Sequence, residues 1–212
     1  MREPHAAEGG PAARTETRVC IVIAGVGGQG VITAARLLAR AAHAEGARVV
    51  AGQMHGMSQR GGSVVATVVV GGASSIVPAG TADVLLATEP SEALRALGQL
   101  RRGGLAIVST RPSVPPSLRA GRTAYPDGGA ILGALAAQAG AVVAFDGAAL
   151  ALEAGSPQVL NVVMLGALAG SGRAPVGAAA LLTAIEATGR GAVVAVNRRA
   201  FELGRAQAVR GG

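Results

Sequence analysis

The apolar positions of this chain fall into short β-branched runs that alternate with segments of helical spacing. The first run, residues 18–24, is almost entirely apolar, as expected of a strand covered on both faces of a sheet. Four glycines follow it between positions 25 and 30, and the apolar spacing then becomes helical. The pattern therefore predicts a strand, a glycine turn and a helix over about residues 28–45.

The same alternation continues to the end of the chain. Further strands are predicted over residues 48–53, 63–71, 83–87, 105–109 and 142–145, and further helices over residues 89–100, 127–139, 147–154, 158–169, 176–188 and 196–209. Asp127, Asp146, Ser156 and Asn197 stand where they would cap helices. Gly71-Gly72 predicts a hairpin into a short edge strand over residues 73–77, which Pro78 would end.

Alternating strands and helices indicate an α/β fold. We expect a Rossmann-like, doubly wound and mostly parallel sheet with a β-hairpin insertion and a helical C-terminal part. Residues 1–17 mix Pro, Gly and charge without periodicity and predict a disordered tail. Residues 18–212 are then one domain, a size that allows a proper core.

The glycines Gly25, Gly27 and Gly30 match the spacing of a dinucleotide-binding turn, and Gly28 adds a further position without a side chain. The free N–H groups at the start of the next helix favour an anion. However, the second strand ends in Gln53 rather than in the acid that would bind the ribose of NAD. The sequence leaves open a site for another anion and a tight turn without any ligand.

A polar loop follows the second predicted strand, at the edge where open α/β sheets bind ligands. Its candidate residues are His55, Ser58, Gln59 and Arg60. Histidine could move protons, and arginine could hold a carboxylate or phosphate. No carboxylate close in sequence completes a Ser-His-acid set, so His55 and Arg60 are contributors at most and binding is favoured over independent catalysis.

Composition removes several classes of enzyme. All 19 basic residues are arginine, so neither a Walker P-loop nor Schiff-base chemistry can be built. Cys20 is the only cysteine, and a single cysteine cannot hold an iron–sulfur cluster. It lies in the first predicted strand, where we interpret it as a small buried residue. We therefore expect no metal site on this chain.

The formal charge of +7 does not by itself indicate nucleic acid, because the arginines are scattered and aromatic residues are nearly absent. No apolar run approaches the roughly 20 residues that span a membrane, and the N-terminus lacks a signal-peptide pattern. The sequence predicts a cytoplasmic protein without nucleic-acid or membrane partners.

Three linked motifs resemble the gamma-type domain of 2-oxoacid:ferredoxin oxidoreductases, over about residues 18–204. They are Gly25-Val-Gly-Gly-Gln-Gly30, His55-Gly-Met-Ser-Gln-Arg-Gly-Gly-Ser63, and Val77-Pro78 before Ala82-Asp83 and Glu89-Pro90. The form of the second motif most resembles the small (beta) subunits of indolepyruvate ferredoxin oxidoreductases. Asn161-Val-Val-Met-Leu-Gly166 and the segment from Asn197 to Gly204 also resemble that subunit.

The resemblance implies a reaction in which an aryl 2-oxoacid and coenzyme A give acyl-CoA, carbon dioxide and reduced ferredoxin. Thiamine diphosphate, magnesium and iron–sulfur clusters would lie in a large alpha subunit, through which ferredoxin is also engaged. Gly27, Gly28, Gln29 and Gly30 would face the phosphate or pantetheine of coenzyme A, and Ser58, Gln59 and Arg60 would shape the approach to thiamine. A stand-alone Rossmann-type enzyme using NAD or a flavin, and a non-catalytic sensing or scaffolding module, are the alternatives.

Overall fold

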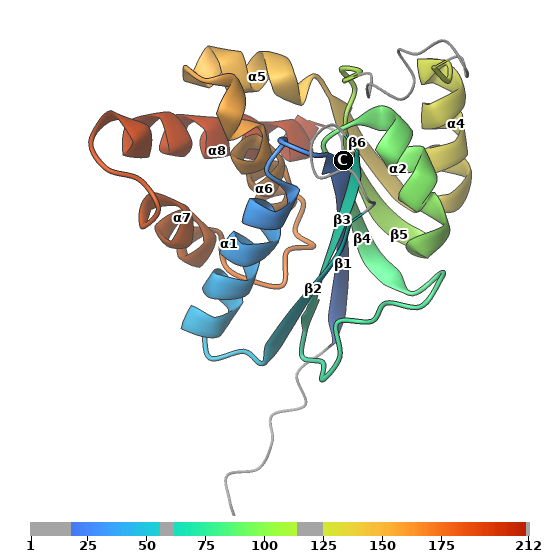
Figure 1. Ribbon diagram of the computed structural model, residues 1–212, viewed down its shortest axis with the longest axis horizontal. Coiled ribbons are helices and arrows are strands. Elements are labelled where there is room, and N and C mark those ends of the chain that lie inside the picture. The colour runs from blue at the N-terminus through green and yellow to red at the C-terminus, as the bar shows by residue number, and fades with distance from the viewer. Residues whose placement is uncertain (1–17, 56–61, 114–124, 211–212) are drawn as a thin grey trace, which may run out of the picture.

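The computed structural model describes residues 18–55, 62–113 and 125–210, which form one three-layer unit (Figure 1). The strands are β1 (Val19–Val26), β2 (Val49–His55), β3 (Ser63–Val70), β4 (Ala82–Ala87), β5 (Leu100–Ser109) and β6 (Ala141–Phe145). The helices are α1 (Val31–Ala44), α2 (Pro90–Ala96), η1 (Leu97–Gln99), α4 (Gly128–Gln138), α5 (Gly147–Ala154), η2 (Pro157–Val159), α6 (Leu160–Gly170), α7 (Ala178–Glu186) and α8 (Ala192–Arg210). The predicted tail, residues 1–17, lies outside the described residues.

The strands form one sheet in the order β2-β3-β1-β4-β5-β6. Neighbours from β1 to β6 pair in parallel, whereas β3 runs antiparallel to both β1 and β2. The sheet is therefore mostly parallel, and the predicted α/β fold is confirmed. The second strand of the β1-α1-β2 unit does not lie beside the first, because β3 is inserted between them.

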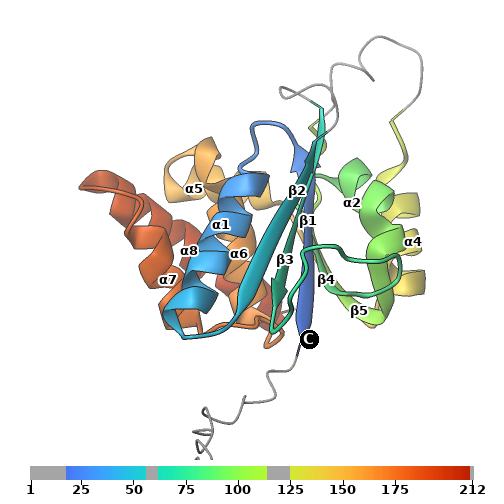
Figure 2. The same ribbon diagram turned by 60° about the horizontal axis from the view of Figure 1, so that its bottom comes forward.

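Helices cover both faces of the sheet (Figure 2). Helices α1, α5, α6, α7 and α8 lie on one face, and α2 and α4 lie on the other. Successive residues of β1 point to opposite faces, so Ile21 and Ile23 enter the larger core while Val22 enters the smaller one. This double coverage explains why the strands read as continuous apolar runs.

The predicted edge strand over residues 73–77 is not formed, and that expectation was wrong. The hairpin of the fold pairs β2 with β3, one strand earlier in the chain. Residues 71–81 instead cross the β2–β3 pair without strand pairing, held where the Thr67 hydroxyl donates to the Ser75 carbonyl at 2.8 Å. Ser74 also turns the chain locally, because its hydroxyl accepts the Ile76 amide at 3.1 Å.

Three of the four predicted caps are present. Asp127 accepts the Ala130 amide, Asp146 accepts the Ala149 amide, and Ser156 accepts the amide of Gln158. Asn197 was predicted wrongly as a cap: α8 already begins at Ala192, after a turn that contains Gly191 in a left-handed conformation. Asn197 is consequently a buried residue of the helix interior.

Helix α6 is the centre of the helical layer. Every residue from Leu160 to Leu168 is buried, because the helix is enclosed by the sheet, α1 and α8. Its contact with α8 is close enough that a Cβ at Gly204 would lie 1.9 Å from the carbonyl oxygen of Val163. Among the described helices, none has both the length and the apolar character needed to cross a bilayer.

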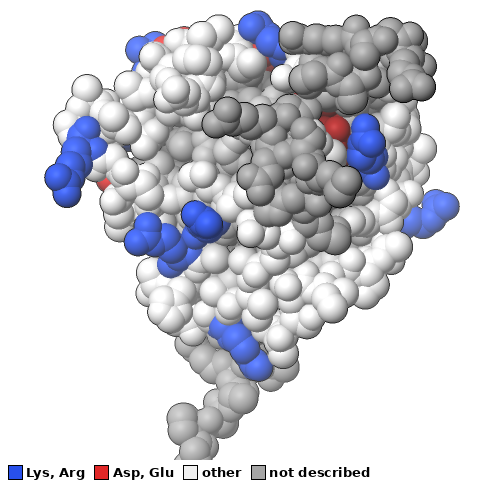
Figure 3. All heavy atoms as spheres, in the orientation of Figure 1, with Lys and Arg blue, Asp and Glu red and all other residues white. Residues whose placement is uncertain are grey.

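The arginines on the face drawn in Figure 3 lie in separate groups rather than in one continuous basic patch. Among the described residues, several arginines are paired with carboxylates, including Arg198 with Glu186 and Arg205 with Glu202. Exposed pairs of this kind contribute little stability, on the order of 0–1 kcal/mol each. The absence of a nucleic-acid partner stays a prediction.

Candidate functional site

The site predicted from sequence lies at the carboxyl edge of the parallel strands. Here the glycine turn after β1 meets Thr88 after β4 and Ser109 at the end of β5. Helix α1 leaves the turn toward one face of the sheet, and α2 leaves β4 toward the other. This reversal between neighbouring strands is where doubly wound sheets bind ligands.

The glycine turn depends on the absence of side chains. Gly28 and Gly30 have φ of 102° and 78°, in the left-handed region that favours glycine. A Cβ at Gly25 would lie 2.0 Å from Thr88 Oγ1, and one at Gly30 would lie 2.8 Å from Asn161 Cγ. The buried Asn161 of α6 therefore packs directly against the turn.

Gln29 has a structural role that its sequence position did not reveal. Its Oε1 accepts the Val26 amide at 2.8 Å and the Thr88 hydroxyl at 2.7 Å. These donors leave only the Nε2 end of the side chain for a ligand. Contact between Gln29 and a ligand stays a prediction, now restricted to that nitrogen.

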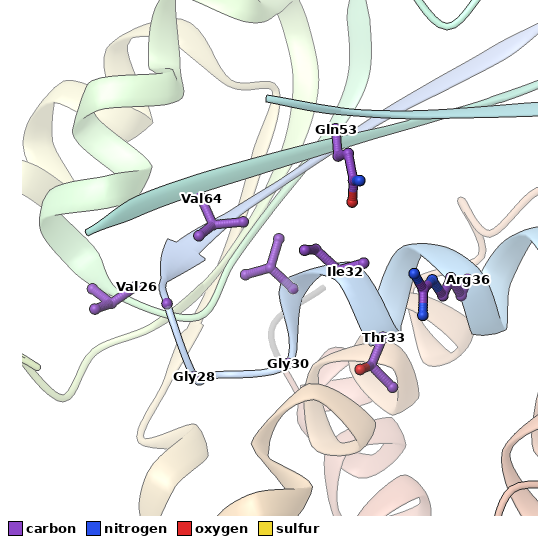
Figure 4. Close-up of a pocket in the computed structure, with 10 residues that line it drawn as sticks. Val26, Gly28, Gly30, Ile32, Thr33, Arg36, Gln53 and Val64 are labelled. Atoms are coloured by element: carbon purple, nitrogen blue, oxygen red, sulfur yellow. The ribbon is translucent and has the colours of Figure 1, made fainter. Parts of the chain in front are cut away.

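A cavity of about 510 Å³ opens beside the turn, between α1 and the β2–β3 pair (Figure 4). It is lined by Val26, Gly27, Gly28, Gly30, Val31, Ile32, Thr33, Arg36, Gln53 and Val64. The three glycines were predicted for the site, but Thr33 and Arg36 were not. Their signal was present in the sequence, since Thr33 and Arg36 are three residues apart in the predicted helix and therefore share one face of it.

The cavity suits an anion. It lies at the first turn of α1, where the backbone N–H groups lack intrahelical partners and the helix dipole is positive. Arg36 adds a guanidinium from the second turn, and none of the described lining residues is a carboxylate. Gly27 contributes less than predicted, because its N–H donates to the Gly62 carbonyl at 2.8 Å.

The polar loop cannot be placed against this cavity. Ser58, Gln59 and Arg60 lie outside the described residues, and their roles stay predictions. His55 is the last residue of β2 and is paired in register with Val64, which lines the cavity. The end of β2 and the start of β3 therefore both lie at the edge of the sheet that carries the glycine turn.

Two carboxylates behind this edge are buried, which the sequence did not predict. Glu89 is fully buried and caps α2 by accepting the Glu92 amide. It also accepts the Ser91 hydroxyl, the Ser113 amide and the Tyr125 hydroxyl. Glu92 is likewise buried and accepts the Ser63 hydroxyl.

These contacts have electrostatic consequences. Burial and the hydrogen bond to Glu89 raise the pKa of Tyr125 above its ordinary value. Burial also raises the pKa of the Cys20 thiol, which agrees with its interpretation as an inert core residue. Within the described part of the chain, no group of three or more metal-ligating side chains comes together.

Comparison with known proteins shows to which family this chain belongs. Residues 20–207 match the model of the pyruvate ferredoxin/flavodoxin oxidoreductase family. This chain belongs to that family. The match includes the glycine turn, the cavity and nearly all of α8.

Individual members are similar over almost their whole lengths. The chain is 40% identical over 195 residues to the indolepyruvate oxidoreductase subunit IorB of Archaeoglobus fulgidus, covering 92% of this chain and 97% of that one. It is 43% identical to the IorB of Pyrococcus horikoshii, covering 87% and 93%. The crystal structure of a keto/oxoacid ferredoxin oxidoreductase gamma subunit from Geobacter sulfurreducens superposes with a TM-score of 0.67 at 27% identity, covering 91% and 99%.

Proposed function

We propose that this chain is the small subunit of a thiamine-dependent 2-oxoacid:ferredoxin oxidoreductase, with indolepyruvate or another aryl pyruvate as substrate. The observation that carries the proposal is identity of 40–43% to indolepyruvate oxidoreductase subunits over nearly the whole chain. A large alpha subunit is the proposed partner, and ferredoxin is engaged through the complex. The findings do not support the alternative of a stand-alone NAD or flavin enzyme.

The reaction converts the 2-oxoacid and coenzyme A into acyl-CoA and carbon dioxide, and the released electron pair reduces ferredoxin. Thiamine diphosphate supplies the stabilised carbanion for the decarboxylation when it is bound. We assign it, its magnesium ion and the iron–sulfur clusters to the large subunit. The chemistry of this chain supports the assignment, since one buried cysteine cannot hold a cluster.

The chain's own contribution is then to bind and orient coenzyme A. The first-turn amides of α1 and the guanidinium of Arg36 form the donor set expected for a phosphate. A cavity of about 510 Å³ leaves room for more than a single phosphate group. The absence of an acid at the end of β2 argues against a dinucleotide site, and coenzyme A is the phosphate-bearing substrate of the proposed reaction.

Reconstitution tests the proposal. The purified chain alone should not reduce ferredoxin in the presence of an aryl 2-oxoacid and coenzyme A, and should not bind NAD or FAD. Addition of the large subunit should restore activity that depends on both substrates. Activity of the isolated chain, or tight binding of NAD or FAD to it, would overturn the assignment.

Arg60→Ala and Arg36→Gln, made in the assembled enzyme, test whether these two arginines bind a substrate. We expect weaker use of coenzyme A or of the oxoacid with either variant, while the two subunits still copurify. The exposed Arg173 is a suitable control, since it does not line the cavity. Kinetics equal to those of Arg173→Gln would show that neither arginine acts on a substrate.

A further inference from the structure

A second cavity, of about 270 Å³, lies on the other side of the glycine turn. Gly28 lines both cavities, and a Cβ there would meet no atom within 4 Å. The remaining lining comes from Gln29, from Thr88 just after β4, from Ser109 and residues 111–113 at and after the end of β5, from Ala148 of α5, and from residues 157, 158 and 160 of η2 and α6. Nothing in the function proposed above uses this cavity.

Ser109 is the residue that points to a ligand here. It is the last residue of β5, is 0% exposed, and lines the cavity. Its Oγ has no hydrogen-bond partner within the described residues, although buried hydroxyls are almost always bonded. Gly147 leaves space beside it, since a Cβ at that position would lie 3.1 Å from Ser109 Oγ.

Three other side chains bring donors to the same cavity. Gln29 has its Nε2 left after its oxygen is used in the turn, and Gln158 contributes a second carboxamide. Arg111 donates from Nε and Nη2 to Asp146 at 3.0 and 2.6 Å, which leaves three of its five N–H groups. These donors reach the cavity from separate segments of the chain.

The lining favours acceptor oxygens on the ligand. No Asp or Glu is among the lining residues that the structure describes. The nearby Asp146 is already engaged, because it accepts the Ala149 amide in addition to Arg111. A ligand group with several acceptor oxygens could therefore bond Ser109, Gln29, Gln158 and Arg111 without facing an unpaired carboxylate.

We propose that this second cavity binds the oxyanion group of a substrate, with Ser109 and Arg111 as its central donors. The substrate itself follows from the proposed function, so the group is either a phosphate of coenzyme A or the carboxylate of the oxoacid. A ligand that reached from one cavity to the other would pass over Gly28, where no side chain blocks the way.

The test uses the assembled enzyme with Ser109→Ala and Arg111→Gln. Arg101→Gln is a matched control, because Arg101 lies near the amino end of the same strand and also pairs with an aspartate, Asp83, at 2.8 Å. We expect Ser109→Ala and Arg111→Gln to lower kcat/KM on the order of 10- to 100-fold, as for lost hydrogen bonds to a charged group. Arg101→Gln should stay within about twofold of wild type.

Measuring kcat/KM separately for coenzyme A and for the oxoacid identifies which oxyanion group the cavity binds. A loss confined to coenzyme A assigns a phosphate, and a loss confined to the oxoacid assigns a carboxylate. Because Ser109 Oγ has no hydrogen-bond partner among the described residues, Ser109→Ala should unfold at the same temperature as wild type or higher. It should nevertheless show a smaller thermal shift with the affected substrate.

Two results would overturn the subsite: kinetics of Ser109→Ala and Arg111→Gln equal to those of Arg101→Gln, or a Ser109→Ala protein that is clearly less stable. The second would show that the hydroxyl serves the fold. An inactive wild-type complex would instead count against the proposed function. The two failures are therefore distinguishable.

Discussion

Gly204→Ala changes one hydrogen into a methyl group at the contact between α6 and α8. The new Cβ would lie 1.9 Å from the carbonyl oxygen and 2.7 Å from the carbonyl carbon of Val163. Both atoms belong to the backbone of a buried helix, so no side-chain rotation can relieve the clash. One helix must move away from the other.

The expected loss follows from that geometry. Overpacking in a core usually costs about 1–3 kcal/mol, and a clash with backbone belongs at the upper end, about 3 kcal/mol. For a domain of this size such a loss lowers the unfolding temperature by roughly 6–12 °C. Urea unfolding followed by circular dichroism would measure the change in free energy directly.

Gly133→Ala is the matched control. Gly133 is an exposed residue in the middle of α4, and a Cβ there would meet nothing within 4 Å. Alanine is the better helix former, so this variant should gain about 0.5–1 kcal/mol. If Gly204→Ala proved as stable as Gly133→Ala, the close packing of α6 on α8 would be refuted.

Three further predictions concern the carboxyl edge and its surroundings. Gly25→Ala would place a Cβ 2.0 Å from Thr88 Oγ1, and we expect it to lose about 1–3 kcal/mol in urea unfolding and to raise KM for coenzyme A. The pKa of Tyr125, the only tyrosine, is raised, so absorbance near 295 nm should show no tyrosinate in the folded protein at pH about 10, where an unfolded chain titrates. The stability that the protonated Tyr125 contributes is fully present below its pKa in the unfolded chain and is lost as the pH rises through its pKa in the folded protein. Tyrosinate in the native protein at about pH 10 would contradict the hydrogen bond to Glu89. Burial acts to raise the pKa of Asp146, but the Ala149 amide and Arg111 outweigh it and lower that pKa. The folded protein should therefore lose stability as the pH drops through the folded-state pKa of Asp146. Asp146→Ala should remove this pH dependence and cost about 1 kcal/mol of stability through the lost cap.

The fold class could be predicted because it depends on local periodicity. Each predicted strand that formed is an apolar, β-branched run, and the caps at Asp127 and Asp146 satisfy amides only three residues away. The placement of β3 could not be predicted in the same way. Its pairing with both β1 and β2 is a contact between distant segments, and its residues read equally well in any interior position of the sheet.

The candidate site shows the same limit. The glycine turn was recognisable because positive φ angles at Gly28 and Gly30 require glycine. A helix was predicted to begin at residue 89, but the burial of Glu89 was missed because the three donors besides the Glu92 amide include Ser113 and Tyr125, which are 24 and 36 residues away. Ser109 was missed for a different reason: a serine at a strand end is ordinary, and only the packed structure shows that its hydroxyl is unpartnered.

The glycine turn is held in place by the protein before any ligand arrives. The Gly62 carbonyl accepts the N–H of Gly27, Gln29 ties the turn to Thr88, and Asn161 packs against Gly30 from the opposite side. A turn that is ordered in advance loses little conformational entropy on binding, so more of the interaction energy appears as affinity. It also fixes the position of Gly28 between the two cavities. Loosening the turn, as Gly25→Ala would do through Thr88, should therefore weaken binding in both cavities, whereas Ser109→Ala should affect only one.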